Sequence, residues 1–265
     1  MTTNKKELNQ LLDFAVDMAR EAGAITDRYY QGSFVAERKI DNSFVTTADL
    51  ETENYLRTRI AKAFPDDSIL GEEDGEQPGS SNRRWILDPI DGTYSFVHGV
   101  PLYGVLIAME LDGEPVLGVV NLPALNELVY AARALGCFWN GELSRVSATS
   151  ALDQALLLST DFGVCEQYGF GPAAASLQRQ VHARRTWGDA YGHVLVATGR
   201  ADIMIDPVMN VWDCAALLPI LEEAGGTFTD WNGTRTIYGG NAISTNGLLF
   251  DRVMQTVRLK VDGSN

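Results

Sequence analysis

The sequence predicts an α+β protein in which layers of helix and sheet pack on one another. Three observations support this prediction. Residues 5–64 carry two long patterns of helical spacing, and residues 68–120 form a run of short segments rich in apolar and β-branched residues. The rest of the chain alternates between short strands and helices. We expect one domain over residues 1–265, with halves at about 1–150 and 151–265.

Two amphipathic helices are expected near the N-terminus. Apolar residues recur at helical spacing over residues 8–22, which predicts a helix from Lys5 to about Tyr30 that Gly32 ends. A second helix is expected from about Asp49 to Phe64, and Pro65 ends it.

Short strands and tight turns are expected next. The apolar segments predict strands at Ser68–Leu70, Arg84–Leu87, Leu102–Leu111 and Glu114–Val120. Asp112-Gly113 forms a hairpin turn between the last two, and Asn140-Gly141 marks a second turn. The polar stretch 77–82 is interpreted as a surface loop, because it separates motifs that belong together.

The second half predicts a mixture of both element types. We expect strands at Leu156–Ser159, Ile203–Ile205 and Ala242–Ser244, and helices at Pro172–Gln180, Ala190–Ala197, Asp213–Ala224 and Leu248–Val257. Pro219 lies too deep in the third of these helices to be a free first-turn proline, so we expect a kink or a later start there. Gly225-Gly226 closes that helix.

Composition excludes several classes of function. Lys and Arg number 21 against 35 Asp and Glu, so the formal net charge is −14, which argues against binding to nucleic acid or anionic membranes. Metal ions could still attract an anionic substrate. No apolar run approaches the ~18 residues of a membrane span, and the polar N-terminus does not resemble a signal peptide. Three scattered cysteines suit free thiols in a reducing compartment, so we expect a cytoplasmic protein.

An acidic motif at residues 85–96 carries the clearest chemical signal. A strand is expected to run into Asp88, where Pro89 ends it, and Asp91 follows three residues later. The two carboxylates can converge on one point with the Ile90 carbonyl between them, an oxygen ligand set that suits Mg²⁺. The alternative is an ordinary turn, because Asp, Pro and Gly are common turn residues.

Gly92 and Thr93 open a predicted helix directly after this motif. The free amides and the positive dipole end of such a helix would face an anion.

Three further stretches place acidic or hydroxyl groups at the ends of predicted elements. Gly71-Glu72-Glu73 follows a strand, although a solvated acidic loop is the alternative. Trp212-Asp213 opens a helix, where Asp213 would otherwise be an ordinary N-cap beside a core tryptophan. Thr46 and Asp49 have the spacing of a capping box, which the residues alone favour.

Taken together, these stretches resemble the four signatures of the inositol monophosphatase superfamily, over roughly residues 8–258. They occur in the family's order as Lys39-Ile-Asp41-Asn-Ser43-Phe-Val45-Thr46-Thr-Ala48-Asp49, Gly71-Glu72-Glu73, Trp85-Ile-Leu-Asp88-Pro-Ile-Asp91-Gly-Thr93 and Trp212-Asp213…Glu223-Ala-Gly225-Gly226. The resemblance implies a layered α/β/α/β/α sandwich. It also implies a Mg²⁺-dependent, often lithium-sensitive phosphomonoesterase with two or three Mg²⁺ ions in each active site.

The resemblance also assigns roles to individual residues. The metal ligands it implies are Glu72, Asp88, the Ile90 carbonyl, Asp91 and Asp213. Thr93 and Glu72 match the pair that activates the attacking water, and Gly92 and Thr93 match the amides that bind phosphate. Thr46 and Asp49 match a supporting pair near that water, a role they can combine with capping. We also expect a homodimer.

The second half resembles the histidinol-phosphate phosphatase branch more closely than the inositol phosphatases. The stretches concerned are Thr186-Trp-Gly188-Asp189-Ala-Tyr191-Gly192-His193, Leu195-Val-Ala197-Thr-Gly199-Arg200-Ala-Asp202, Asp206-Pro207 and Phe228-Thr-Asp230-Trp231. The branch implies hydrolysis of L-histidinol phosphate to L-histidinol and phosphate, a step of histidine biosynthesis. Asp189 and Asp206 would then bind the imidazole or the ammonium group, and Arg184 or Arg185 would reach the phosphate.

Two alternatives stay open at this point. In an inositol-1-monophosphatase or a broad-specificity sugar phosphatase, Asp206 would bind ring hydroxyls instead. In a catalytically idle scaffold, the chain would keep the metal and act through a protein partner. The presence of Glu72, Thr93 and Asp213 favours an enzyme. The three histidines, His98, His182 and His193, have no metal-ligand spacing to one another, and His182 is interpreted as a surface or subunit contact.

Overall fold

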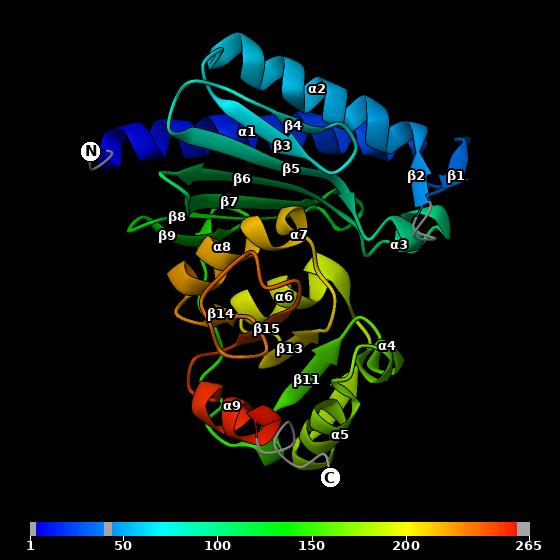
Figure 1. The fold of residues 1–265 in the computed structure, drawn as a ribbon, viewed down its shortest axis with the longest axis vertical. Coiled ribbons are helices and arrows are strands. Elements are labelled where there is room, and N and C mark those ends of the chain that lie inside the picture. The colour runs from blue at the N-terminus through cyan, green and yellow to red at the C-terminus, as the bar shows by residue number, and fades with distance from the viewer. Residues whose placement is uncertain (1–3, 40–43, 259–265) are drawn as a thin grey trace.

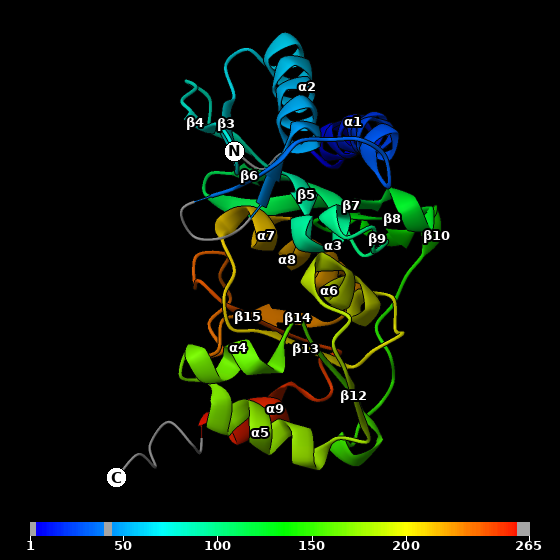
Figure 2. The ribbon, with the colours of Figure 1, turned by 90° about the vertical axis from the view of Figure 1, so that its right-hand side faces the viewer.

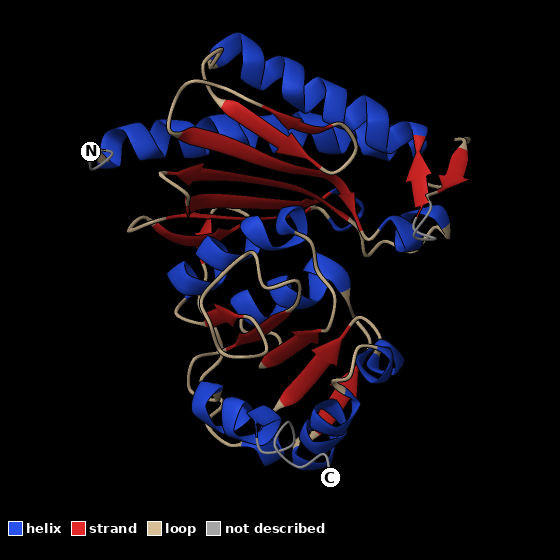
Figure 3. Cartoon of the chain, in the orientation of Figure 1, coloured by secondary structure: helices blue, strands red, loops and turns tan. Residues whose placement is uncertain are grey.

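Two sheets and three helical layers alternate through the molecule, which a computed structural model describes for residues 4–39 and 44–258 (Figure 1). Figure 3 shows the helices between the two sheets and on their outer faces. The order is helix, sheet, helix, sheet, helix, so the predicted layered α+β fold is confirmed. Of the described helices, none combines the length and the apolar character needed to cross a membrane.

The first sheet has the strand order β10-β9-β8-β7-β6-β5-β3-β4. Its strands are β3 (Ser68–Gly71), β4 (Gly75–Gln77), β5 (Arg83–Asp91), β6 (Gly104–Leu111), β7 (Glu114–Leu122), β8 (Glu127–Ala132), β9 (Gly136–Trp139) and β10 (Glu142–Leu143). All neighbours are antiparallel except β3 and β5. A separate ribbon pairs β1 (Ala36–Arg38) with β2 (Phe44–Thr46).

The second sheet has the strand order β12-β11-β13-β15-β14. Its strands are β11 (Leu156–Ser159), β12 (Ala183–Arg185), β13 (Ile203–Asp206), β14 (Thr227–Thr229) and β15 (Ala242–Thr245).

The helices are α1 (Lys5–Tyr29), α2 (Thr47–Ala63), α3 (Thr93–Val97), α4 (Phe162–Gln167), α5 (Gly171–Gln180), α6 (Asp189–Ala197), α7 (Val211–Ala215), α8 (Leu217–Ala224) and α9 (Phe250–Arg258), with short 3₁₀ turns at Pro123–Leu125 and Leu152–Gln154.

Alternation along the strands explains the layers. In β5, Trp85 and Leu87 pack against α1 and α2, whereas Ile86 faces the opposite way, into a core that it shares with α6 and α8. That central core also includes Met204 and Phe228 of the second sheet. A third core joins the other face of the second sheet to α4, α5 and α9, which lie below that sheet in Figure 2. Buried on both faces, the two sheets hold the ends of their strands in fixed positions.

The sequence correctly predicted most of these elements, and a few differ. The turn at Asp112-Gly113 has φ values of 54° and 81°, as a tight hairpin turn requires. The predicted break near Pro219 is confirmed, because α7 ends at Ala215 and α8 begins at Leu217. The prediction that Pro89 ends its strand is wrong: β5 continues to Asp91 through an irregularity in its pairing with β6.

Several short strands were not predicted from the sequence. They include β8 and β9, as well as the edge strands β4, β10, β12 and β14. Most have four residues or fewer, which is too short for an alternation pattern to be recognised. Four of them, β4, β8, β9 and β10, pair with the strand that directly precedes them, so pairing with that neighbour decides their conformation more than their own short sequences do.

Candidate active site

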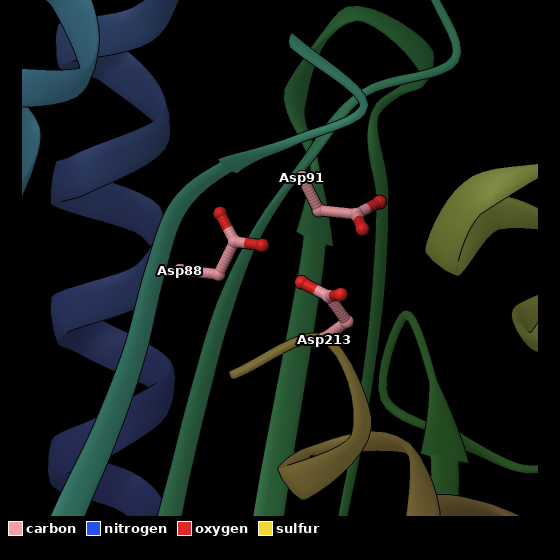
Figure 4. Close-up of side chains that lie close together, drawn as sticks. All are labelled: Asp88, Asp91 and Asp213. Carbon is pink, nitrogen blue, oxygen red and sulfur yellow. The ribbon is translucent and has the colours of Figure 1, made fainter. Parts of the chain in front are cut away.

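Three carboxylates from two distant parts of the chain meet at one end of the first sheet. Asp88 and Asp91 belong to the end of β5, and Asp213 belongs to the first turn of α7. The three side chains point toward one another (Figure 4). One oxygen of each lies within 4.8 Å of the others, so a single cation can contact all three groups.

An irregularity in β5 explains how Asp88 and Asp91 face the same point. In a regular strand, residues three apart would point to opposite faces of the sheet. Here the register of the pairing with β6 shifts between the two aspartates. Pro89 lies at this irregularity, and because proline has no amide hydrogen it could not have donated a strand hydrogen bond there. The Asp88 Oδ1 atom accepts a hydrogen bond of 3.0 Å from the Ile90 amide, which fixes the turned segment.

Burial makes this cluster electrostatically unfavourable without a cation. Burial raises the pKa of Asp88 and of Asp91 well above the ordinary value, and the neighbouring charges of Glu72 and Asp189, respectively, raise them further. Burial also raises the pKa of Asp213 to about 7, although the Asn210 amide opposes the shift. A bound cation would relieve this repulsion. Because the cluster consists of carboxylates alone, it suits a hard cation such as Mg²⁺.

Glu72 lies at the exit of β3 and faces the same centre. It lines an open cavity of about 690 Å³ together with the three aspartates, Ile90, Gly92 and Thr93. The Lys39 ammonium group donates to Glu72 Oε1 and to Glu73 Oε1, each at 2.8 Å. The Glu73 side chain is only 6% exposed, so these residues do not form the solvated acidic loop that was the alternative.

Glu53 is a supporting residue that the sequence did not reveal. This fully buried side chain of α2 accepts hydrogen bonds from the amides of Glu73 (2.9 Å) and Asp74 (3.0 Å) and from Arg57 Nε (2.8 Å). It therefore fixes the turn that follows Glu72. A Cβ atom on Gly71 would lie 2.2 Å from Glu53 Oε1, so the arrangement requires glycine there. A buried acidic position among the polar residues of α2 was the only available signal.

Gly92 and Thr93 form the start of α3, as predicted. Gly92 has a φ of 75°, and a Cβ atom on it would lie 2.8 Å from the Leu102 carbonyl oxygen, so only glycine fits. The Thr93 hydroxyl donates to the Ile90 carbonyl at 2.9 Å. The first amides of a helix have no acceptor within the helix, so those of α3 can donate to a group in the cavity.

Thr46 and Asp49 form the predicted capping box at the start of α2. Asp49 Oδ2 accepts hydrogen bonds from the Thr46 amide (2.7 Å) and hydroxyl (2.5 Å). Its Oδ1 atom is buried and has no partner among the described residues. Burial is the main cause that raises the pKa of Asp49 to about 6. Residues 40–43 of the same motif, including Asp41 and Ser43, lie outside the described residues.

A second cavity adjoins the first and contains the two predicted substrate residues. It has a volume of about 440 Å³ and is lined by Asp161, Asp189 and Asp206 and by the apolar residues Val164, Pro207, Val208 and Met209. Asp91, Asp189 and Asp213 line both cavities. A group bound beside the carboxylate cluster can therefore extend into this acidic pocket.

Asp189 adopts an unusual backbone conformation between the two cavities. Its φ is 54°, which is rare for a residue other than glycine, and its amide donates to Thr160 Oγ1 at 2.8 Å. The next amide, of Ala190, donates to Asp91 Oδ2 at 2.8 Å. Burial and then the charge of Asp206 raise the pKa of Asp189 to about 7. The contact with Thr160 joins residues 29 positions apart and was not predicted from the sequence.

The two candidate arginines lie outside both cavity linings. Arg184 Nη1 donates to the Gln178 carbonyl, and Arg185 Nη1 donates to the Arg184 carbonyl at 2.7 Å. Both side chains belong to β12 and are exposed. The structure therefore brings Glu72, Asp88, Asp91, Thr93, Asp189, Asp206 and Asp213 together, and leaves Arg185 outside.

Comparison with known proteins identifies the family. The model of a family described as the inositol monophosphatase family matches residues 7–260. The chain belongs to this family. The resemblance found in the sequence is thus confirmed, and the chain is a phosphoric monoester hydrolase rather than an idle scaffold. Members of the inositol monophosphatase family are metal-dependent, in agreement with the carboxylate cluster of Asp88, Asp91 and Asp213.

Relatives of this family member carry different names. A histidinol-phosphatase of Chlorobaculum parvum is 44% identical over 237 residues, which cover 88% of this chain and 90% of the relative. A fructose-1,6-bisphosphatase/inositol-1-monophosphatase of Thermotoga maritima is 35% identical, with 95% and 97% covered. Among solved structures, the extragenic suppressor protein SuhB of Bartonella henselae has a TM-score of 0.88 at 29% identity, with 95% and 99% covered. The fold is thus shared across several activities.

Proposed function

We propose that this phosphatase hydrolyses L-histidinol phosphate to L-histidinol and phosphate, as a step of histidine biosynthesis, with Mg²⁺ as its metal. The observation that carries the proposal is the acidic pocket formed by Asp189 and Asp206 beside the carboxylate cluster. The name of the Chlorobaculum parvum relative supports the same substrate.

The metal would be held by the carboxylates of Asp88, Asp91 and Asp213, with Glu72 and the Ile90 carbonyl as further ligands. Mg²⁺ at such a site neutralises phosphate charge and lowers the pKa of a bound water. Two or three ions are expected from the family resemblance. The Ile90 carbonyl already accepts one hydrogen bond, from Thr93, and a carbonyl oxygen has a second lone pair available.

Thr93 and Glu72 are proposed to orient and deprotonate the attacking water. Because the Thr93 hydroxyl donates its proton to the Ile90 carbonyl, its oxygen is left to accept a hydrogen bond from water. Glu72 lines the same cavity and can take the proton. Asp49, whose Oδ1 atom has no partner among the described residues, and Thr46 would support this position. The amides of Gly92 and Thr93 would hold the phosphate oxygens.

The alcohol part of the substrate would extend into the second cavity. Histidinol phosphate carries an ammonium group and an imidazole, which are both suited to an acidic pocket. Burial is the main cause of the raised pKa of Asp189, and the negative charge of Asp206 raises it further; a cation bound between the two carboxylates would offset that repulsion. Hydrogen bonds between charged partners are roughly twice as strong as neutral ones. The apolar side chains of Val164, Val208 and Met209 can contact the imidazole ring.

A parallel assay tests this proposal. Phosphate release is measured from histidinol phosphate, inositol 1-phosphate and an adenosine bisphosphate, each with Mg²⁺ and with a chelator. We expect histidinol phosphate to have at least ~10-fold higher kcat/KM than inositol 1-phosphate, a difference of about 1.4 kcal/mol in transition-state binding. Chelation should abolish all activity, and full activity in metal-free buffer would contradict the Mg²⁺ proposal.

An inositol-1-monophosphatase or broad sugar phosphatase is the second candidate. It is favoured by the name of the Thermotoga maritima relative, and Asp206 would then accept hydrogen bonds from ring hydroxyls. Equal rates on histidinol phosphate and inositol 1-phosphate would support this candidate instead. The phosphate contact of Arg185, the homodimer, the cytoplasmic location and the single-domain organisation stay predictions. Light scattering would test the homodimer.

A further inference from the structure

A buried histidine joins the acidic pocket to the second sheet. His193 Nε2 lies 3.2 Å from Asp206 Oδ2, and His193 Nδ1 lies 2.6 Å from Ser244 Oγ. His193 and Ser244 are completely buried, and neither lines the two cavities described above. The three side chains have the connectivity of a hydrolytic triad. The serine is nevertheless out of reach of any substrate, so a nucleophilic role is excluded.

The contact with Asp206 determines which ring nitrogen of His193 carries the proton. A carboxylate has no proton to donate, so the contact with Asp206 requires a proton on His193 Nε2. In the neutral ring, Nδ1 then accepts a hydrogen bond, and the Ser244 hydroxyl can supply it. The Asp206 carboxylate therefore selects the tautomer with the proton on Nε2, and the Ser244 hydroxyl holds that ring in place by donating to Nδ1.

Asp206 has a second donor, which links it to Asp189. Asp206 Oδ1 accepts a hydrogen bond of 3.2 Å from the Thr160 amide. The hydroxyl oxygen of the same threonine accepts a hydrogen bond from the Asp189 amide. Both oxygens of Asp206 thus have a protein donor. These two donors hold the carboxylate in place against the repulsion expected between two acids of one small pocket.

One helix, α6, carries one acid of the pocket, Asp189, and contacts another, Asp206. Asp189 is the first residue of α6, and His193 follows four residues later, on the same face. Asp189 reaches the pocket directly, whereas His193 acts on it through Asp206.

We propose that His193 is a positioning residue for substrate specificity: its Nε2 proton fixes Asp206 in the orientation that receives the cationic end of the substrate. This inference rests on the proposed function, because it assumes that the pocket binds a cation. It predicts that loss of the Nε2 donor weakens selection for the cationic substrate more than it weakens phosphate hydrolysis itself.

A matched pair of variants tests the donor. In His193→Gln, the side-chain amide can occupy the position of Nε2 and still donate to Asp206. In His193→Asn, the shorter amide reaches only the position of Nδ1, so the donor is lost. The measurement is the ratio of kcat/KM for histidinol phosphate to kcat/KM for glycerol 2-phosphate, which carries no cation. We expect this ratio to fall about tenfold in His193→Asn and to stay within about twofold in His193→Gln.

The remaining outcomes would contradict the inference, each for a different reason. An unchanged ratio in His193→Asn, or an equal fall in both variants, would show that the ring only fills space. A wild-type ratio near one would overturn the proposed function, and this inference with it.

Should His193→Asn fail to fold, Ser244→Ala provides the test. It removes the hydrogen bond to Nδ1 that holds the ring against Asp206, so we expect the same ratio to fall by roughly threefold, since one neutral hydrogen bond is lost. No change in that ratio would overturn the inference.

Discussion

The two cavities of the active site are built by different means. In the metal cavity, which contains Asp88, Asp91 and Asp213, two of the three aspartates are fixed by neighbours in sequence. Asp88 accepts a hydrogen bond from the Ile90 amide, and Asp213 accepts one from the Asn210 amide. Asp91 is the exception, because its donor is the Ala190 amide, 99 positions away. In the substrate pocket, the supports come from distant parts of the chain, since Asp206 is held by Thr160, which lies 46 positions away. Local contacts help to make the metal-side motifs recognisable in the sequence, whereas the supports of the proposed substrate pocket are tertiary contacts.

The largest effect is expected from the metal cavity. Asp91→Asn and Asp213→Asn each remove one ligand charge but keep the shape of the side chain. We expect either substitution to lower kcat/KM at least ~10³-fold for every substrate, because the loss affects the phosphate centre that all esters share. Steady-state rates at saturating Mg²⁺ measure this effect.

Thermal melting in chelator controls for folding in these two variants. The Asn side chain at position 213 can still accept the Asn210 amide, so the helix cap survives. We expect the metal-free variants to melt no lower than the metal-free wild type, because a buried charge has been removed. A much lower melting temperature would assign these aspartates a structural role as caps.

A smaller effect is expected from the support behind Glu72. In Gly71→Ala, the new methyl group would clash with Glu53 and displace it from the amides of Glu73 and Asp74. We expect metal affinity, measured by titration with Mn²⁺ or Mg²⁺, to fall about tenfold, as for other groups that orient ligands. Raising the metal concentration should restore most of the activity.

Gly75→Ala is the matched control in the same turn. Gly75 has a φ of 64°, so alanine there strains the backbone, but its Cβ atom would meet no atom within 4 Å. Gly75→Ala should lower the stability of the folded protein without lowering its metal affinity. Equal metal affinities in the two variants would mean that Glu53 does not position Glu72.

The smallest effect concerns stability and pH in the metal-free protein. Asp213 and Asp189 have pKa values raised to about 7, mainly by burial, from an ordinary value of 3.8. Between these limits the folded state binds more protons than the unfolded state, so stability falls as pH rises from about 4 to 7. We expect the melting temperature in chelator to be higher at pH 5.5 than at pH 8, with a shallower slope in Asp213→Asn. A stability that rises with pH over this range would contradict the assignment.

The difference between local and distant contacts explains how much could be predicted from the sequence. The layered fold and the metal-side residues were predictable, since each motif lies at the end of a strand or the start of a helix. The continuation of β5 past Pro89 was missed, because a bulge depends on pairing with β6. Glu53 and His193 were missed because their partners lie 20 and 51 positions away and only the fold brings them together.

The separation of hydrolysis from specificity is tested most directly by Asp189→Ala. The measurement is kcat/KM for histidinol phosphate and for inositol 1-phosphate in the variant and in the wild type. We expect the wild-type preference of at least ~10-fold to narrow toward equality, mainly because kcat/KM for histidinol phosphate falls. A loss of the same size on both substrates would show that Asp189 belongs to the hydrolytic centre and that the acidic pocket does not select the substrate.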